Sequence, residues 1–465
     1  MGMETQRDKL RQADKETLIE LIELLQKRVN SLEKQVRELK KLMQVGPEPS
    51  KGVSKTPENS SIPSGQAYKA QKVNRIKQKR GPKVGHVGKS RQRSAADEVL
   101  ECRAEVCSHC GEVLGQLAQQ RLGSRQVIDL PPFEYVVREA RCYGLNCPRC
   151  GSVQRGSYPS GFEVGRTFGA RLEQVALYLH HAHPLSYQRV QHILRDLYGL
   201  DLSLGALVNA VQRHATVLPT AAETIRQHLK AAAVVGCDET SVRVAGKNYW
   251  QWVFQTPDWV YMRIHRRRAG LVIREVLQAA QPEVWVSDLG SMQLDHPAKD
   301  WQVCLAHQVR DLQYAIDAHR CSWAYRLQTL LVKAIRLSKH RQHIAAHHFS
   351  AQVHRVEHQL QHLLAQYPNY PVSQRLHWRF TKHRASLLVF LQRSDVPPTN
   401  NASEQALRNS VIYRKVTGGF RTPPGAQCYA DLVSILETAR RQQRNLFDTL
   451  AFILARQPAF LPLRE

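Results

Sequence analysis

The first apolar pattern along the chain is a heptad repeat near the N-terminus. Apolar residues alternate at spacings of four and three, at Leu18, Ile22, Leu25, Val29, Leu32, Val36, Leu39 and Met43. β-Branched residues fall at the a positions and leucines at d, which favours a parallel two-stranded coiled coil. The pattern predicts a coiled coil over residues 1–45 and a homodimer or higher oligomer. The alternative is an amphipathic helix that packs on its own chain.

Apolar periodicity disappears over residues 46–98. Prolines are mixed with serine, glycine and lysine, and a basic run follows. This composition cannot bury enough apolar surface to fold alone, so we expect a disordered basic linker. The concentrated charge favours an arm that follows a DNA backbone over a plain solubilising spacer. Its candidate DNA-binding residues are Lys77, Lys79, Arg80 and Lys83.

Two matching cysteine motifs come next, each a Cys-x-x-Cys pair followed by glycine. Their cysteines are Cys107, Cys110, Cys147 and Cys150. A Cys-x-x-Cys turn lets both thiolates face one metal, the glycine permits the tight turn, and two such pairs complete a tetrahedral site. We therefore predict structural Zn²⁺ in a zinc-ribbon-like module over residues 99–160. Expected strands are Gln126–Asp129 and Phe133–Arg141. Cys102 and Cys142 are expected to be unpaired buried thiols, and the alternative is that they are zinc ligands.

Residues 161–225 have a helical pattern. The expected helices are Leu172–His181, Ser186–Leu197 and Ser203–Arg213, with a break at Gly199. A helix, a short glycine turn and a second helix outline a helix-turn-helix DNA-binding region. Its candidate contacts to DNA are Asn209, Gln212 and Arg213. An ordinary helical hairpin that packs domains together remains an alternative.

Strand patterns begin at residue 231. The expected order is Ala231–Cys237, Ser241–Val244, Tyr249–Gln255 and Tyr261–Arg267, then a helix over Ala269–Ala279, a strand at Val284–Ser287 and a further one at Trp301–Ala306. This order predicts a ribonuclease H-like core over residues 226–310 and 392–450. Residues 311–391 read as a helical insertion with solvated histidines, and 451–465 as a C-terminal tail. For Cys304 and His307, packing or support of a nearby site is favoured over metal binding.

Three acidic residues stand in distinctive settings. Asp238 and Asp288 directly follow apolar strands, whereas Glu404 lies near the start of a helical stretch. Two strand-end carboxylates and one helical carboxylate suit a pair of divalent cations for phosphoryl transfer. Glu239 is excluded because successive strand residues point to opposite faces. The alternative for Glu404 is a capping box with Asn401 as the N-cap.

Cations follow the third acid. They are Arg408, Arg414, Lys415 and Arg421, with Gly418 and Gly419 between them. An acid, cations and a flexible glycine loop together suit a site that grips a phosphodiester.

The overall charge strengthens this interpretation. The 465 residues include 66 Lys and Arg against 40 Asp and Glu, a net charge of +26. Such an excess indicates a polyanionic partner, here double-stranded DNA. No apolar run approaches the roughly 20 residues that span a bilayer, and the N-terminus lacks the apolar region of a secretory signal. We expect a cytoplasmic, nucleoid-associated protein without a membrane partner.

Several motifs together resemble the transposases of the insertion-sequence 66 family. They are Asp238-Glu-Thr, Asn248-Tyr-Trp-Gln-Trp-Val-Phe, Gln302-Val-Cys-Leu-Ala-His-Gln-Val-Arg-Asp-Leu, Asn400-Asn-Ala-Ser-Glu-Gln-Ala-Leu-Arg and Val411-Ile-Tyr-Arg-Lys-Val-Thr-Gly-Gly-Phe-Arg. The order of domains is also similar. Two departures from the family pattern are Leu289-Gly-Ser-Met after the second acid and Ser403 before the third.

The resemblance implies a DDE transposase, a multidomain α+β and α/β protein whose catalytic triad is Asp238, Asp288 and Glu404. It implies two Mg²⁺ ions, cleavage of the ends of a mobile element, and joining of the 3′-hydroxyl ends to target DNA. Separate accessory transposition proteins are also implied. Two other functions remain open from the sequence: a DNA-binding regulator derived from a transposase, and a metal-dependent nuclease without strand transfer.

Overall fold

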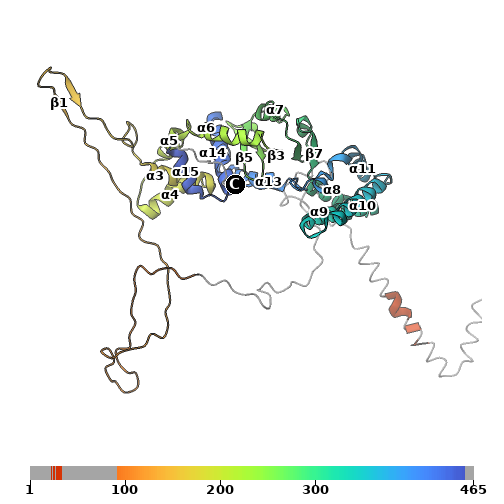
Figure 1. The fold of residues 1–465 in the computed structure, drawn as a ribbon, viewed down its shortest axis with the longest axis horizontal. Helices are drawn as coiled ribbons and strands as arrows, with labels where there is room; N and C mark the ends of the chain where they lie inside the picture. Colours follow the sequence, from red (N-terminus) through yellow and green to blue (C-terminus); the bar gives the residue numbers. More distant parts are fainter. Residues whose placement is uncertain (1–21, 24, 27, 34–91, 456–465) are drawn as a thin grey trace, which may run out of the picture. The chain divides into compact units, whose positions relative to one another are not determined.

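The computed structural model describes residues 22–23, 25–26, 28–33 and 92–455. The basic-arm residues Lys77, Lys79, Arg80 and Lys83 lie outside the described residues, as do the heptad positions Leu18, Val36, Leu39 and Met43. Residues 92–455 divide into two compact units, one of residues 160–191 and 202–455, the other of residues 92–159 and 192–201. Figure 1 shows the labelled elements in chain order.

The described N-terminal residues are helical and leave their apolar positions in solvent. Ile22, Leu25, Val29 and Leu32 are each 52–54% exposed. These are four successive a and d positions of the heptad pattern. An apolar stripe that covers nothing within the described chain is compatible with pairing to another chain, and the coiled coil stays a prediction.

The smaller unit contains little regular structure. β1 (Gly144–Asn146) and β2 (Val153–Arg155) form an antiparallel pair around the second cysteine motif, and a bridge joins Val106 to Val113 around the first. The strands expected at Gln126–Asp129 and Phe133–Arg141 are absent, so that prediction was wrong. Val136 and Val137 are each 81% exposed, and an alternating pattern forms a strand only where one face is buried.

The larger unit begins with helices. They are α3 (Ala170–Leu177), the π-helical segment η1 (Tyr178–Ala182), α4 (Tyr187–Tyr198), α5 (Leu204–His214) and α6 (Leu218–Lys230). Residues 192–198 of α4 belong to the smaller unit. Ser203 caps α5 as expected, because its side chain accepts a hydrogen bond from the amide of Ala206 at 3.1 Å. Gly199 ends α4 with a φ of +65°, a conformation that glycine adopts without strain.

A five-stranded mixed sheet lies at the centre of this unit, in the order β5-β4-β3-β6-β7. Its strands are β3 (Val234–Val244), β4 (Lys247–Gln255), β5 (Val260–His265), β6 (Val284–Ser287) and β7 (Asp300–Val303), with α7 (Leu271–Leu277) between β5 and β6. β4 pairs antiparallel with β3 and β5, whereas β6 pairs in parallel with β3 and β7. The two strands expected between Ala231 and Val244 are one continuous strand, because β4 pairs with β3 without interruption from Gly236 to Val244.

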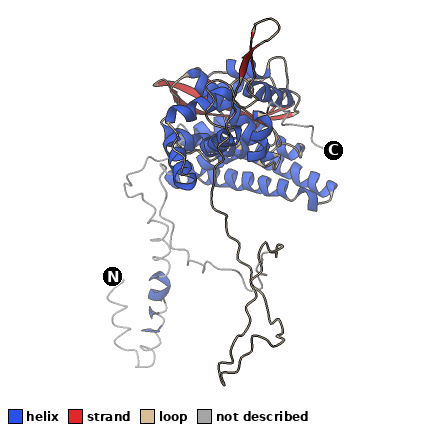
Figure 2. Ribbon diagram, turned by 90° about the vertical axis from the view of Figure 1, so that its left-hand side faces the viewer, coloured by secondary structure: helices blue, strands red, loops and turns tan. Residues whose placement is uncertain are grey.

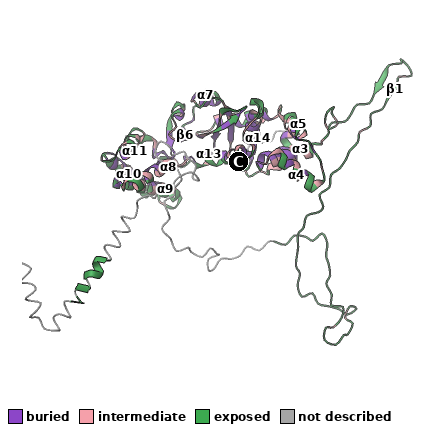
Figure 3. Ribbon diagram, turned by 180° about the vertical axis from the view of Figure 1, so that it is seen from behind, coloured by how far each residue is buried: buried purple, intermediate pink, exposed green. Residues whose placement is uncertain are grey.

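The last three described helices include two that pack on this sheet and a third that packs on neighbouring helices. They are α13 (Asn401–Thr417), α14 (Pro423–Arg441) and α15 (Leu446–Leu454). Two buried hydroxyls of α14 bind edge strand β5: Ser434 accepts from the amide of Met262 at 2.7 Å, and Thr438 from that of Val260 at 3.0 Å. These bonds satisfy edge amides that would otherwise be buried without partners. Figure 2 shows strands of the sheet among the helices, and Figure 3 colours β6 as buried. Residues 451–454 belong to α15 rather than to a tail.

A helical bundle stands between β7 and α13. It consists of α8 (Leu305–His319), α9 (Ser322–Lys339), α10 (Ala346–Leu364), α11 (Pro371–Lys382) and α12 (Val389–Gln392). The apolar core of the bundle includes Leu331, Val356 and Phe390 and continues to Val284 and Val286 of β6. The buried indole of Trp323 donates to the carbonyl of Leu363. β7 ends at Val303, so the strand expected to reach Ala306 is shorter and Cys304 instead precedes α8. None of the described helices is both long and apolar enough to cross a membrane.

Candidate active site

Asp238 and Asp288 lie on neighbouring parallel strands. The register of β3 and β6 pairs Val234 with Val284 and Gly236 with Val286, an offset of 50 residues that also separates the two acids. Asp288 directly follows the last residue of β6. Two residues in the same register of adjacent strands point to the same face. The sheet therefore presents both carboxylates side by side.

Two backbone amides hold these carboxylates. The amide of Glu239 donates to Oδ1 of Asp238 at 2.9 Å, and the amide of Gly290 donates to Oδ1 of Asp288 at 2.9 Å. A Cβ at Gly290 would stand 2.5 Å from the sulfur of Met292 and 3.0 Å from Oδ1 of Asp288. The segment Leu289-Gly-Ser-Met, which departs from the family pattern, thus supplies the Gly290 amide that binds Asp288, and it leaves no room for a side chain at Gly290.

Glu404 lies in the first turn of α13. Asn400 is the N-cap and makes no side-chain capping bond, and Asn401 is the first helical residue. The capping box considered for Asn401 and Glu404 is therefore wrong. The Glu404 carboxylate instead approaches His307 of α8, whose Nε2 lies 3.7 Å from its Oε1.

Asn400 fixes the start of this helix against the sheet. Its side chain donates to the carbonyl of Cys237 at 2.7 Å and accepts from Ser403 Oγ at 2.6 Å, and its backbone amide donates to the sulfur of Cys304 at 3.1 Å. Asn400, Ser403, Cys237 and Cys304 are all buried. Sequence reasoning missed Asn400, although it stands directly before the helix that carries Glu404. Cys304 and His307 therefore contact the elements around the acids, as the favoured interpretation expected.

The site concentrates negative charge. Burial raises the pKa of Asp238 well above its ordinary value, and the carboxylates of Asp288, Glu239 and Glu404 raise it further. Among the described residues, no cationic side chain forms an ion pair with Asp238 or Asp288. Clustered carboxylates without a cationic partner repel each other. Their oxygen donors match the preference of Mg²⁺, so the donor set fits a divalent cation.

The described side chains do not form a preassembled metal cage. No group of three or more His, Cys, Asp or Glu residues in the described part of the chain is close enough to hold an ion. For three mutually repelling carboxylates this separation is the expected arrangement in the absence of a counter-charge.

Glu239 has different partners. Its side chain is 1% exposed; Oε1 accepts from Arg268 at 2.8 Å and Oε2 accepts from Gln293 at 2.7 Å. The guanidinium of Arg268 also lies over the ring of Trp250. Burial raises the pKa of Glu239, and Asp288 adds to this effect whereas Arg268 opposes it. Both oxygens of Glu239 are thus occupied by the protein.

The candidate DNA-binding residues divide into two groups. Arg414 donates to Thr240 at 2.9 Å and to Ser241 of β3, and Arg213 forms an ion pair at 2.6 Å with the buried Glu173. Both arginines therefore tie helices to their own unit. The others are exposed: Asn209, Gln212, Arg408, Lys415 and Arg421.

The glycine pair after these cations is not a flexible loop. Gly418 ends α13 with a φ of +77°, and Gly419 has a φ of +114°. The next residue, Phe420, donates to the carbonyl of Arg243 at 2.8 Å and accepts from the amide of Ala245 at 2.8 Å. These bonds fix the segment against the end of β3, which corrects the expectation of flexibility.

Both cysteine motifs adopt the same turn. The amide of Gly111 donates to the carbonyl of Cys107 at 3.0 Å, that of Gly151 to the carbonyl of Cys147 at 2.8 Å, and both glycines have positive φ. The four cysteines do not come together as a metal site in the described chain. Cys102 and Cys142, expected to be buried, are exposed.

The comparisons with known proteins agree with the geometry of the larger unit. A search of curated proteins returned no match. The family model described as "Transposase IS66 family" matches residues 165–428, more than half of the chain. This span begins before α3, ends within α14 and includes all three acids. The chain therefore belongs to the IS66 family of transposases.

Proposed function

We propose that this protein is a DDE transposase that cleaves the ends of its mobile element and joins the resulting 3′-hydroxyl groups to target DNA. Membership of a transposase family implies transposition and DNA binding. The observation that carries the finer proposal is that Asp238 and Asp288 each lie two residues beyond the paired residues Gly236 and Val286, and that Asp288 and Glu404 both raise the pKa of Asp238. The strand order β5-β4-β3-β6-β7 supports the assignment of a ribonuclease H-like core to residues 226–310 and 392–450.

In this proposal Asp238, Asp288 and Glu404 would hold divalent cations, with Mg²⁺ the expected ion. Such ions stabilise the attacking and leaving oxygens of a phosphodiester during in-line displacement. The protein's own residues set the geometry. Asn400 fixes the helix of Glu404 on β3, and His307 stands beside the Glu404 carboxylate. Exposed Arg408, Lys415 and Arg421 would contact the DNA backbone near this helix.

The remaining modules are assigned in the same proposal. Residues 1–45 would pair two chains, residues 46–98 would follow DNA as a basic arm, and α4 with α5 would form the helix-turn-helix of residues 161–225. The exposed positions of Asn209 and Gln212 on α5 support a DNA contact there. The bundle of residues 311–391 would be an insertion between the second and third acids. Residues 99–160 would bind zinc, and accessory proteins would assist transposition.

The test is a cleavage reaction with the full chain, Mg²⁺ and labelled DNA that carries the ends flanking its gene. Each lost carboxylate removes several kcal/mol of charge stabilisation, so Asp288→Asn should reduce cleavage by roughly 1,000-fold or more. The matched control is Asp295→Asn, because Asp295 is an exposed acid paired with Arg274. It should cleave like the wild type.

The outcomes separate the alternatives. Cleavage followed by joining to a target plasmid supports a transposase. Cleavage that leaves free 3′-hydroxyl ends without joining indicates a nuclease. Sequence-specific binding without cleavage by the wild type indicates a DNA-binding regulator, and cleavage retained by Asp288→Asn would overturn the assignment of the triad.

A further inference from the structure

The helical bundle contains a basic groove between α9 and α10. It encloses about 500 Å³ and is lined by five cationic or imidazole side chains: Lys333, Arg336, His340, His343 and Arg355. All five are exposed, whereas Leu337 and Val356 form a buried apolar floor. The groove therefore presents positive charge on its rims and apolar surface beneath.

No acid lines the basic groove. Lys333, Arg336 and Arg355 form no ion pair with another described residue, although other arginines of the bundle do. Arg379, for example, pairs with the buried Asp311 at 2.8 Å. Residues 305–392 hold twelve Lys and Arg against three Asp and Glu. The groove thus keeps its charge available to a ligand in solution.

Helix stability alone does not explain this charge. Cations in a last helical turn interact favourably with the helix dipole, and this accounts for Arg336 and Lys339 in the last turn of α9. Lys333 lies two turns before that end, and Arg355 lies within α10. Residues 333, 336, 337 and 340 follow the i, i+3, i+4, i+7 spacing of a single helix face.

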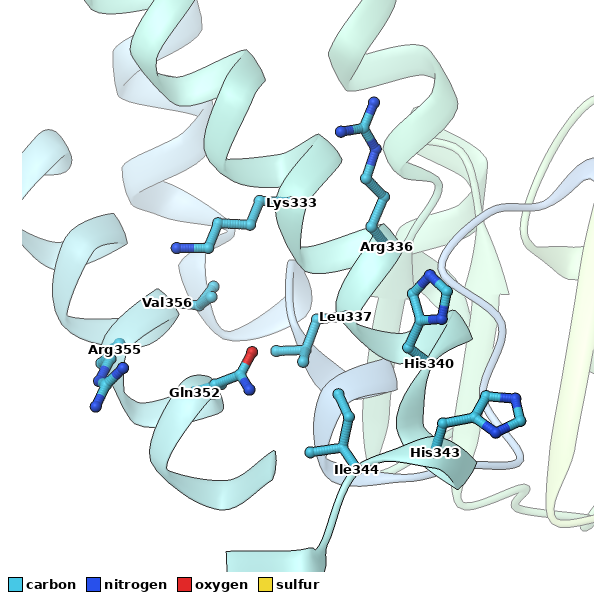
Figure 4. A pocket seen from close by; sticks show the side chains of 9 residues that line it. All are labelled: Lys333, Arg336, Leu337, His340, His343, Ile344, Gln352, Arg355 and Val356. Carbon is cyan, nitrogen blue, oxygen red and sulfur yellow. The ribbon is translucent and has the colours of Figure 1, made fainter. Parts of the chain in front are cut away.

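The cations are spread along the groove rather than gathered at a point. Figure 4 shows Lys333 extending from α9 toward α10, with Arg336, His340 and His343 along one side and Arg355 on the other. From residue 333 to residue 340 an α-helix rises by about 10 Å. One strand of duplex DNA presents a phosphate about every 3.4 Å of its axis. The face of α9 can therefore follow several consecutive phosphates, which suits a DNA backbone better than a small anion.

We propose that the basic groove binds the sugar–phosphate backbone of duplex DNA and that the bundle is a second DNA-binding surface beside the acids. The inference rests on the proposed function for its biological setting. Lys333, Arg336 and Arg355 would neutralise phosphates, while the imidazoles of His340 and His343 would donate hydrogen bonds to phosphate oxygens. Contacts of this kind position DNA and carry no sequence information.

The test compares two triple variants of the full chain, both carrying Asp288→Asn so that binding is measured without cleavage. The groove variant is Lys333→Gln, Arg336→Gln and Arg355→Gln. The control variant is Arg326→Gln, Lys339→Gln and Lys382→Gln, which removes equal charge from exposed positions outside the groove. Affinity for duplexes with and without element ends is measured over a range of salt concentrations, and circular dichroism checks the fold.

The groove variant should lose affinity equally for both duplexes. Because each lost phosphate contact lowers the slope of log affinity against log salt by about 1, its slope should fall by about 3. The control variant should keep the slope of its parent. Equal slopes for the two triple variants would overturn the inference, because the loss of affinity would then come from the lower net charge of the protein and not from the groove.

Failure of the proposed function would give a different result. If the wild type binds DNA but never cleaves it, a selective loss in the groove variant still supports the groove as a DNA surface. If the wild type cleaves and the groove variant binds like the control, the transposase proposal stands and the groove inference falls.

Discussion

Asp238 and Asp288 each lie two residues beyond Gly236 and Val286, the last paired residues of the parallel strands β3 and β6, and the charge of Asp288 acts on Asp238. Fifty residues of sequence separate them, yet they face the same side of the sheet. Burial and the neighbouring carboxylates raise the pKa of Asp238. Carboxylates that repel one another in this way favour a bound cation.

Glu239 should be structural rather than catalytic. Because Arg268 and Gln293 occupy both oxygens, Glu239→Gln should place an amide NH₂ against one of these donors. The free energy of unfolding should fall by about 1–3 kcal/mol. Cleavage by the folded variant should stay within about tenfold of the wild type, whereas Asp238→Asn should lose activity. Urea unfolding and the cleavage rate measure the two effects. A folded Glu239→Gln variant without cleavage would make Glu239 a member of the site.

Asn400 should be required for both stability and cleavage. Replacement by alanine leaves the buried carbonyl of Cys237 and the hydroxyl of Ser403 without their partner, which costs about 1–3 kcal/mol. The helix start that carries Glu404 also loses its anchor. The neighbouring Asn401 is exposed, so Asn401→Ala should change stability by less than about 0.5 kcal/mol. Equal losses in urea unfolding for the two variants would contradict the anchoring role.

Gly419 should tolerate no side chain. Its φ is +114°, and a Cβ there would stand 2.5 Å from the carbonyl oxygen of Arg243. Gly419→Ala should therefore combine a steric clash with backbone strain of roughly 1–3 kcal/mol. Gly418 also has a positive φ but has nothing within 4 Å of a new Cβ, so Gly418→Ala should cost about 1 kcal/mol. Thermal unfolding measures the stability of both variants. A smaller loss of stability for Gly419→Ala than for Gly418→Ala would contradict the predicted clash with Arg243.

Zinc remains a prediction of the two matching cysteine turns. Bound zinc would have to draw the pairs Cys107–Cys110 and Cys147–Cys150 together into one tetrahedral site. We expect one zinc per chain by elemental analysis and its loss in the double variant Cys147→Ser, Cys150→Ser. The control is Cys102→Ser, Cys142→Ser, because both thiols are exposed and lie outside the motifs. Zinc retained by the first variant would exclude the four-cysteine site.

Local patterns predicted much of the larger unit. Apolar runs located β4, β5 and β6 to within a few residues, and helix formers located the bundle after β7. The strands expected between the cysteine motifs do not form, because β-propensity acts only where a face is buried and Val136 and Val137 remain exposed. The capping box failed for a related reason. Asn401 has the correct side chain, but the sheet engages Asn400 instead.

The sequence by itself determined the candidates for the chemistry and for pairing: three acids at element ends, two cysteine turns and a heptad repeat. Each is a short pattern whose spacing along the chain has direct physical meaning. The tertiary structure alone decided their partners. It brought His307 to Glu404, tied Arg213 and Arg414 to the protein, and opened a groove between α9 and α10. Contacts of this kind join segments that are distant in sequence, and they arise from packing that no local pattern encodes.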